Sequence, residues 1–487
     1  GLSFNPRLSR TLQRVVLSGF LLLLALMPIP PWFQGEAGSL AQTKEKGQPD
    51  KTSDPDDLYS YIGGATCSGS ACHGSTSPRS KLRIAQNEFY TWSEKDEHSK
   101  AYDALTTPDS RIIAKNLKIA KPEESNRCLV CHALHVKSER QGKLFDVTEG
   151  VSCEACHGPA DKWLGAHTRS DWDSKKAAEY GMYNTKDLAK RADRCLECHA
   201  GSEGKVVDHE LIGAGHPRLK FEIDNYSHAM PAHWIPPKDK QARQWLGTRA
   251  WATGQVVALR SEMKLLISSR RPKLGPWPDF AHFECFACHH SVVDHLRGMT
   301  EQEKKGQRWR FIDYDGKPGR LVWNASSYAV IRHLVNQISL EQGKVLDELV
   351  KAFREELTSK SVSPDAFAAT LTKLSELTER LLPQIAQYTF SQQTVLSLMR
   401  SISGDGRFLA GAGFQSAEQA VMALASLYDD YVETIGPLSE PLPIKETIEA
   451  LYKDIKDGGA FSPAQFEVNM NKLHGYLSKP IAAPPPS

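Results

Sequence analysis

The arrangement of ten cysteines constrains this 487-residue chain more than any other feature. The cysteines occur strictly in five pairs, and a histidine directly follows the second member of each pair. Four pairs enclose two residues, whereas the first pair encloses four. In chain order the motifs are Cys67-Ser-Gly-Ser-Ala-Cys72-His73, Cys128-Leu-Val-Cys131-His132, Cys153-Glu-Ala-Cys156-His157, Cys195-Leu-Glu-Cys198-His199 and Cys285-Phe-Ala-Cys288-His289. A pattern repeated in this way indicates one kind of site rather than several unrelated ones.

Cys-x-x-Cys-His is the attachment signature of haem c. Two thiols about one helical turn apart can bond the two vinyl groups of one haem, and the adjacent histidine can bind its iron. We therefore predict covalently attached haem c at all ten cysteines, with the histidine of each motif as the proximal iron ligand. A zinc ribbon does not need a histidine after every Cys-x-x-Cys pair. Disulfides suit an exported protein, but five such short bridges would be unusual.

The first motif is wider than the other four. Residues 68–71 are small and flexible enough to bulge outward while both thiols keep their reach. The motif also ends in Cys-His-Gly, as the third motif does. Because widened motifs of this kind occur among multihaem cytochromes, we predict a fifth haem here. The alternative is a local disulfide between Cys67 and Cys72, with His73 incidental.

The N-terminal residues resemble an export signal. Three arginines precede an apolar run over residues 15–27, and three prolines follow it. The run is short for a bilayer span and suits a signal peptide. Cleavage after Ala41 would make Gln42 the first mature residue. We expect export to the periplasm or another place outside the cytoplasm, where bacteria attach haem c; an uncleaved segment would instead associate the chain with a membrane.

The charge balance argues against a nucleic-acid partner. The chain has 60 basic and 58 acidic residues, and residues 1–41 account for the whole net charge of +2. Five haems would add about ten propionates and make the loaded protein acidic. We expect redox proteins as electron donor and acceptor, and no binding to nucleic acid.

Composition and periodicity predict a mainly α-helical chain with two folded parts. About fifty residues per haem leave little room for an ordinary core, so we expect short helices and loops there, followed by a haem-free helical bundle. Helix signals in the bundle include Ser462 as an N-cap, a capping box beginning at Ser416, and Pro383 as a kink or helix end. The predicted divisions are a signal peptide (1–41), a disordered linker (42–58), a pentahaem domain (59–297), a linker (298–325), a helical bundle (326–480) and a disordered tail (481–487).

The remaining histidines supply candidates for the second axial position of each iron. Ten of the other twelve lie before residue 297, among the haem motifs, so an incidental surface role suits best His333 and His474. A second histidine would close an iron for electron transfer, whereas an open position would admit a small ligand. Methionine could also be a ligand, but only eight methionines occur.

Several motifs resemble the cytochrome c-554 family, whose type member is a tetrahaem electron carrier that accepts electrons from hydroxylamine oxidoreductase. The resemblance covers about residues 60–200 and rests on Phe89-Tyr-Thr-Trp92, Glu97-His98-Ser-Lys-Ala101, Gly150-Val-Ser-Cys-Glu-Ala-Cys-His-Gly-Pro159, Gly165-Ala-His167 and the flanks of the other motifs. It implies that His98 is the distal ligand opposite His157 and that His167 is the distal ligand opposite His73. It also implies that the iron of His132 lacks a distal protein ligand, although another segment of the chain could fill that position.

This chain departs from the tetrahaem pattern by a fifth motif, by the segment from His209 to Leu219 and by the helical bundle. We predict His216, His209 and His233, in that order, as distal ligands of the fourth and fifth haems. The spacing of His209 and His216 does not suit a zinc helix, because glycines intervene.

We interpret the chain as an exported pentahaem cytochrome that carries electrons between redox partners, rather than as an enzyme, and we predict no catalytic residue. One alternative is an oxidoreductase of the nitrite or hydroxylamine type acting at one open haem, for which the iron of His132 is the candidate. A pentahaem nitrite reductase, however, typically has Cys-x-x-Cys-Lys at its catalytic haem, and every motif here ends in histidine. Another alternative is a haem-bearing subunit whose helical domain docks a redox complex.

Overall fold

The computed structural model describes residues 59–79, 84–269, 279–285, 322–358, 364–456 and 461–479. The predicted signal peptide, both predicted linkers apart from residues 322–325, and the tail lie outside these residues, as do Cys288 and His289. The described residues are mostly helical and form no β-strand, only three isolated bridges. The predicted mainly α-helical class is therefore confirmed. None of the described helices is both long enough and apolar enough to cross a bilayer.

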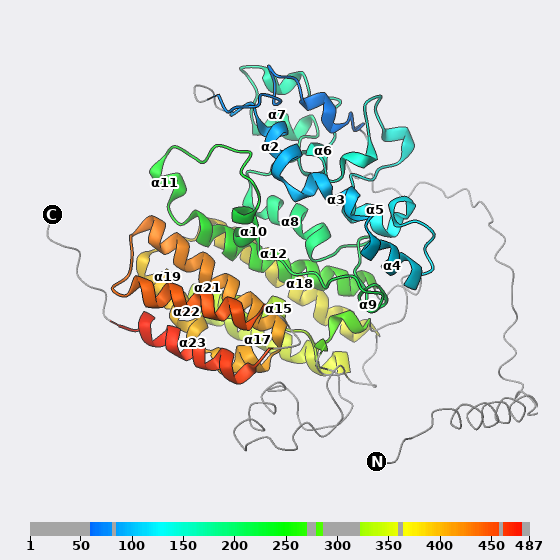
Figure 1. Ribbon diagram of the computed structural model, residues 1–487. Coiled ribbons are helices and arrows are strands. Elements are labelled where there is room, and N and C mark those ends of the chain that lie inside the picture. The colour runs from blue at the N-terminus through cyan, green and yellow to red at the C-terminus, as the bar shows by residue number, and fades with distance from the viewer. Residues whose placement is uncertain are drawn as a thin grey trace, which may run out of the picture. The chain divides into compact units, whose positions relative to one another are not determined.

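The part that contains the first four motifs consists of short helices joined by loops (Figure 1). Its α-helices are α2 (Glu88–Lys95), α3 (Ala101–Ala104), α4 (Pro108–Asn116), α5 (Asn126–His132), α6 (Cys153–His157), α7 (Ser174–Glu179), α8 (Leu188–His199), α9 (His209–Gly213), α10 (Ile223–Ala229) and α11 (Lys240–Arg243). Its 3₁₀ turns are η4 (Gly64–Cys67), η5 (Glu97–Lys100), η6 (Pro122–Glu124), η7 (Ser138–Arg140), η8 (Val147–Glu149) and η9 (Ala166–Thr168). Apolar clusters in this part are small, for example the one formed by Leu105, Leu129 and Ala133.

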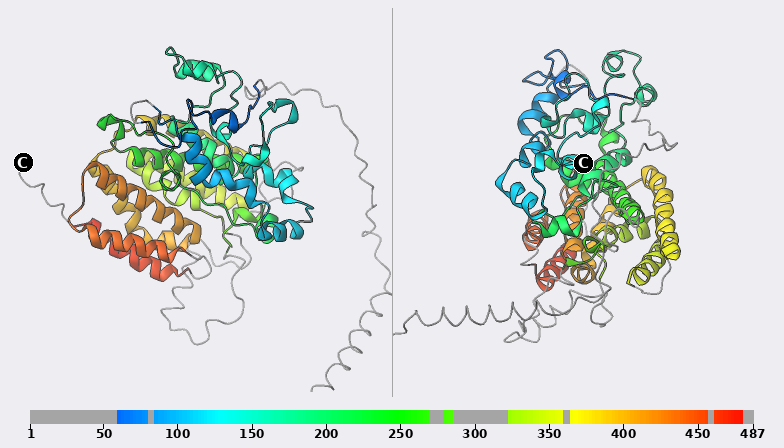
Figure 2. Two further views of the ribbon diagram at one scale, coloured as in Figure 1. Left: turned by 45° about the horizontal axis from the view of Figure 1, so that its top comes forward. Right: turned by 90° about the vertical axis from the view of Figure 1, so that its right-hand side faces the viewer.

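The remaining α-helices form a bundle (Figure 2), and their buried side chains make one continuous hydrophobic core. They are α12 (Leu246–Ser269), α15 (Ser326–Ala329), α16 (Ile331–Ile338), α17 (Leu340–Thr358), α18 (Pro364–Gln387), α19 (Gln392–Gly404), α20 (Gly406–Gly411), α21 (Phe414–Thr434), α22 (Pro441–Asp454) and α23 (Pro463–Leu477). A further turn, η11 (Phe280–His282), precedes the fifth motif and pairs with residues 322–324 next to α15.

Helix α12 belongs to both parts, which the predicted boundary at residue 297 does not anticipate. Trp251, Leu259 and Met263 are fully buried in the bundle core. Ala250 and Val257 of the same helix pack instead with Leu196 of α8, which carries the fourth motif. Because α12 buries side chains around most of its circumference, it needs neighbours on several sides. The helix therefore holds the fourth motif against the bundle.

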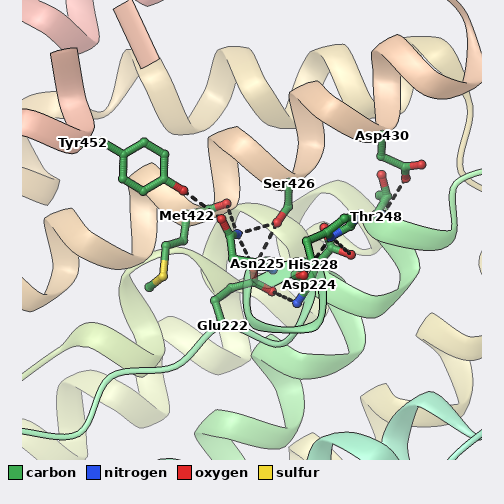
Figure 3. A network of polar contacts seen from close by, with 9 residues as sticks. All are labelled: Glu222, Asp224, Asn225, His228, Thr248, Met422, Ser426, Asp430 and Tyr452. Atoms are coloured by element: carbon green, nitrogen blue, oxygen red, sulfur yellow. Dashed lines mark hydrogen bonds and ion pairs between the residues drawn. The ribbon is translucent and has the colours of Figure 1, made fainter. Parts of the chain in front are cut away.

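A polar network joins the same two parts (Figure 3). The Asn225 amide on α10 donates to the Met422 carbonyl at 2.9 Å and to the Ser426 hydroxyl at 2.7 Å, both on α21. The Thr248 amide donates to the Asp430 carboxylate at 2.6 Å. The Asp430 side chain is buried. The hydrogen bond from the Thr248 backbone amide to its carboxylate offsets part of the free-energy cost of removing that group from water. These bonds fix α10 and α12 to α21.

The local helix signals had mixed success. Ser462 caps α23 by accepting from the Gln465 amide at 3.3 Å, as predicted. Pro383 does not end its helix, because α18 continues to Gln387. Ser416 is not an N-cap: α21 begins at Phe414, and the Ser416 hydroxyl donates to the Ala412 carbonyl.

Candidate haem-binding sites

We number the motifs in chain order as sites I to V, beginning with Cys67, Cys72 and His73. Sites II, III and IV each end a helix: α5, α6 and α8 all terminate at the motif histidine. Within a helix, residues three and four apart lie on one face. The two cysteines and the histidine of each motif therefore point to the same side, where one haem would meet all three.

Site I reaches a similar arrangement through a turn. Cys67 ends η4, and the Cys72 and Gly74 amides both donate to the Gly69 carbonyl, at 2.8 and 3.0 Å. A Cβ atom at Gly74 would lie only 1.7 Å from the Ser68 carbonyl oxygen, so the turn needs glycine there. The longer loop of this motif thus folds onto itself and returns Cys72 and His73 beside Cys67.

The cysteines of the first four motifs form no disulfide with one another or with any other described residue. The alternative in which Cys67 and Cys72 form a local bridge is therefore not what the structure shows. Their thiols remain available for thioether bonds.

Each histidine of sites I to IV faces a second histidine from a distant part of the chain. The ring centres are 6.2 Å apart for His73 and His167, 6.3 Å for His132 and His216, 6.5 Å for His157 and His233, and 6.0 Å for His199 and His98. The ring planes of the first pair are 14° apart, and those of the other three pairs are 84° to 89° apart.

This spacing fits an iron between two imidazoles. Imidazole nitrogens bind transition metals at about 2.0 Å, so two imidazoles on opposite faces of one iron have ring centres about 6 Å apart. One kind of metal site between the rings explains four such similar distances better than four unrelated ring contacts would. The residues present at these four sites therefore fit a haem iron with two histidine ligands.

Hydrogen bonds at Nδ1 orient most of these rings. His132, His167 and His216 place Nδ1 at 3.0, 3.1 and 2.7 Å from backbone carbonyl oxygens, to which it would donate. Two further rings have carboxylate partners: His73 with Glu88 and His98 with Asp96, both at 2.9 Å. A histidine that donates through Nδ1 keeps Nε2 as its metal-binding atom.

Burial keeps several of the other rings neutral. It lowers the pKa of His157 to about 4 and that of His199 to about 4, because an imidazolium would lose its hydration. Nδ1 of His157 is buried and has no hydrogen-bond partner among the described residues. A neutral imidazole is the form that binds a metal.

The structure places His98 differently from what the family resemblance implied, and it places His233 differently from our separate prediction. The backbone carbonyl of His98 does lie beside the third motif, where it accepts from the Val151 amide at 2.9 Å. Its ring, however, turns away from His157 and faces His199. His233 faces His157 instead, although it was predicted for the fourth or fifth haem. The pairing of His167 with His73 agrees with the expectation.

Site II also differs, because His216 lies opposite His132 where an open position was expected. An ion pair brings its segment there: Arg127, next to Cys128, binds Asp208 at 2.8 Å and Glu210 at 2.9 Å. Asp208 in turn caps α9, which leads to His216. The contacts of Arg127 with Asp208 and Glu210 join residues about eighty positions apart in the chain. The two acidic residues beside His209 are the one feature of the sequence that could have indicated these contacts.

His209 does not face any histidine of the first four motifs. Its ring packs against Phe280 at 5.6 Å, and its backbone amide donates to Asp279 at 3.1 Å. The segment 279–285 leads directly to Cys285, the first cysteine of site V. His209 thus lies near the beginning of that motif, whose Cys288 and His289 are outside the described residues.

The four sites follow one another in space in an order that differs from the sequence. The Cys67 and Cys153 side chains lie next to each other, so site I neighbours site III. Cys156 of site III lies near Cys195 and Cys198 of site IV, and the Cys198 thiol donates to the Val130 carbonyl of site II at 4.0 Å. The order is I, III, IV, II.

Comparison with known proteins confirms the resemblance for part of the chain. Residues 65–158 match the family model of cytochrome c554 and c-prime. Multiheme cytochrome MtrA of Shewanella baltica is 28% identical over 117 residues, which are 21% of this chain and 32% of that protein. Cytochrome c-554 of Nitrosomonas europaea is 27% identical over 119 residues, 22% of this chain and 50% of that protein. The chain therefore spans half or less of the length of these relatives. No solved structure matches it.

Proposed function

We propose that this multihaem c-type cytochrome carries electrons between redox partners through five haems c, most or all of them ligated by two histidines. The observation that carries the proposal is the set of four histidine pairs with ring centres 6.0 to 6.5 Å apart. Bound haem supplies an iron that gains and loses one electron. The paired histidines hold both axial positions and exclude small ligands, which suits electron transfer and disfavours catalysis at the iron.

The ligand assignments follow from these pairs. His167 is proposed opposite His73, His216 opposite His132, His233 opposite His157 and His98 opposite His199. The ten cysteines are proposed to bond the haems. His209 is proposed as the distal ligand of site V, supported by its position against residues 279–283 just before Cys285.

The spatial order of the sites supports transport over a distance. The neighbouring motif cysteines support a single series of sites in the order I, III, IV and II. Helix α9 begins near the segment that leads to Cys285 and is followed by His216 of site II. A haem at site V would therefore extend the series beyond site II, so that an electron entering at site I could leave at the other end.

The setting of the protein is part of the same proposal. Haem attachment through thioethers and the N-terminal sequence favour export to the periplasm, either released or held to a membrane by an uncleaved segment. Donor and acceptor are proposed to be redox proteins. The bundle, which holds α8 and the start of site V, keeps the last sites in place and offers a surface to one of these partners.

One experiment separates a carrier from an enzyme. In the absence of oxygen, the fully reduced protein would be mixed with nitrite and the fully oxidised protein with hydroxylamine. A carrier without an open iron should stay reduced in nitrite and then pass its electrons to an oxidised small cytochrome, and it should not turn over hydroxylamine. Rapid reoxidation by nitrite, or turnover of hydroxylamine, would contradict the proposal. The intact mass of the same sample should correspond to five haems, and a mass with four would overturn the assignment of one motif.

A further inference from the structure

Glu88 and Asp96 are charged partners of two candidate axial histidines, whereas the other Nδ1 partners described above are neutral backbone carbonyls. Glu88 accepts from Nδ1 of His73 and Asp96 accepts from Nδ1 of His98, each at 2.9 Å. In contrast, no described carboxylate hydrogen-bonds to either histidine of site II or site III. Sites I and IV therefore each contain one imidazole bonded to a negative charge.

Both carboxylates are shielded from water. The Glu88 side chain is 16% exposed and the Asp96 side chain 5% exposed. Glu88 is held by the Ala85 and Gln86 amides at 2.9 and 3.2 Å, and Asp96 also accepts from the His98 amide at 3.0 Å. Because the positions of the two groups are fixed and little solvent screens them, their charges act strongly on the imidazoles.

Building on the proposed function, we propose that Glu88 and Asp96 lower the reduction potentials of sites I and IV below those of sites II and III. A carboxylate that accepts from Nδ1 increases the electron density of the imidazole and makes Nε2 a stronger donor. A stronger donor stabilises the oxidised iron more than the reduced iron, so the reduction potential falls. Both residues act through a histidine and are therefore positioning residues rather than ligands.

This assignment gives an alternating series. In the spatial order I, III, IV, II, each carboxylate-supported site is followed by one without a carboxylate. The first two electrons to enter the four sites would then occupy III and II, which site IV separates. Two added charges would thus avoid adjacent positions, where their repulsion is greatest.

The test uses variants that remove the charge and keep the shape. In Asp96→Asn the amide oxygen can still accept from both the His98 imidazole and the His98 backbone amide, because one Asp96 oxygen accepts both bonds. In Glu88→Gln the amide oxygen can accept either from the His73 imidazole or from the backbone amides, because different oxygens of Glu88 accept these bonds. The matched control is Glu97→Gln, since Glu97 lies beside His98, carries the same charge and is 85% exposed, with Lys100 as its partner. Each protein would be titrated at a series of potentials while electron paramagnetic resonance reports each oxidised iron.

Site I can be recognised in this spectrum without a mutation. Axial imidazole planes that are nearly parallel give a rhombic low-spin signal, whereas nearly perpendicular planes give a broad signal with a large maximum g value. Only the His73–His167 pair among the four described pairs is nearly parallel, at 14°. In the wild-type protein the rhombic signal should titrate below at least two of the broad signals.

The expected result is specific for each variant. Glu88→Gln should raise the reduced-to-oxidised ratio of the rhombic iron at least tenfold at a fixed potential, which is 59 mV for a one-electron couple. Asp96→Asn should shift one broad signal by a similar factor, and Glu97→Gln should shift neither. Shifts no larger than those of the control would overturn this inference. A missing rhombic low-spin iron in the wild type would instead overturn the proposed ligation of site I.

Discussion

Single residues determine whether each candidate iron site is open or closed. Site II shows this most clearly. The family resemblance implied an open iron at His132, whereas the structure places the ring centre of His216 at 6.3 Å from the ring centre of His132. The motif cysteines and proximal histidines could be predicted, since they depend on spacing within a few residues. The distal partners could not, because they depend on contacts such as Arg127 with Asp208 that join remote segments.

Replacing His216 with alanine should open site II. The iron would lose its second imidazole and become high-spin, and it should then bind nitric oxide or nitrite. Optical and electron paramagnetic resonance spectra would reveal the new high-spin species. The control is His135→Ala, because His135 is close to the same motif in sequence, is exposed and faces none of the motif histidines that the structure describes. An unchanged low-spin spectrum in His216→Ala would contradict the assignment of His216.

The glycine that follows the wide motif should be sensitive to substitution. In Gly74→Ala the new methyl group would meet the Ser68 carbonyl at 1.7 Å, so the turn must shift. We expect a loss of about 1 to 3 kcal/mol of stability, measured by denaturant unfolding of the haem-loaded protein. Gly165→Ala is the matched control, because nothing lies within 4 Å of its added Cβ atom. Equal stability of the two variants would show that site I does not need this turn.

At the scale of elements, α12 packs both with the fourth motif and with the bundle, across the predicted domain division. We placed the predicted boundary just after the last cysteine pair. The hydrophobic core of the bundle instead includes every helix that buries apolar side chains in it. Trp251 and Leu266 on α12 are fully buried with residues of the bundle, although they precede Cys285 in the sequence. The N-cap at Ser462 could be predicted because a cap depends only on residues within one helical turn. The capping-box pattern at Ser416 gave a wrong prediction, because Ser416 lies inside α21 and is buried there.

Glu262 on α12 should make stability depend on pH. It accepts from the Trp323 indole at 2.9 Å and from Ser327, and burial raises its pKa from 4.5 to about 7. The folded protein therefore retains a proton that the unfolded chain releases above pH 4.5. The resulting stabilisation is present below about pH 4.5 and is lost as the pH rises to about 7.

Glu262→Gln isolates this effect, because its amide stays neutral and can still accept from Trp323. From pH 4.5 to 7 the stability of the wild type should fall relative to the variant by up to about 3 kcal/mol, and the difference should stay constant above pH 7. Thermal unfolding of both haem-loaded proteins at each pH would measure it. Parallel curves across this range would show that Glu262 is ionised in the folded protein.

At the scale of the whole molecule, four histidine pairs lie in neighbouring sites, and α12 packs site IV against the bundle through α8. The sequence was sufficient to predict the cofactor and a mainly α-helical fold. It could not predict the order of the sites, because that order depends on how the short helices pack around one another and on α12.

The central claim is that every described site has two histidine ligands, and electron paramagnetic resonance of the fully oxidised protein tests it most directly. We predict one rhombic low-spin signal from site I and three broad low-spin signals with large maximum g values from sites II, III and IV, matching plane angles of 14° and of 84° to 89°. These signals should not change when nitric oxide or nitrite is added. The loss of any of them to a high-spin species that binds either ligand would contradict the account.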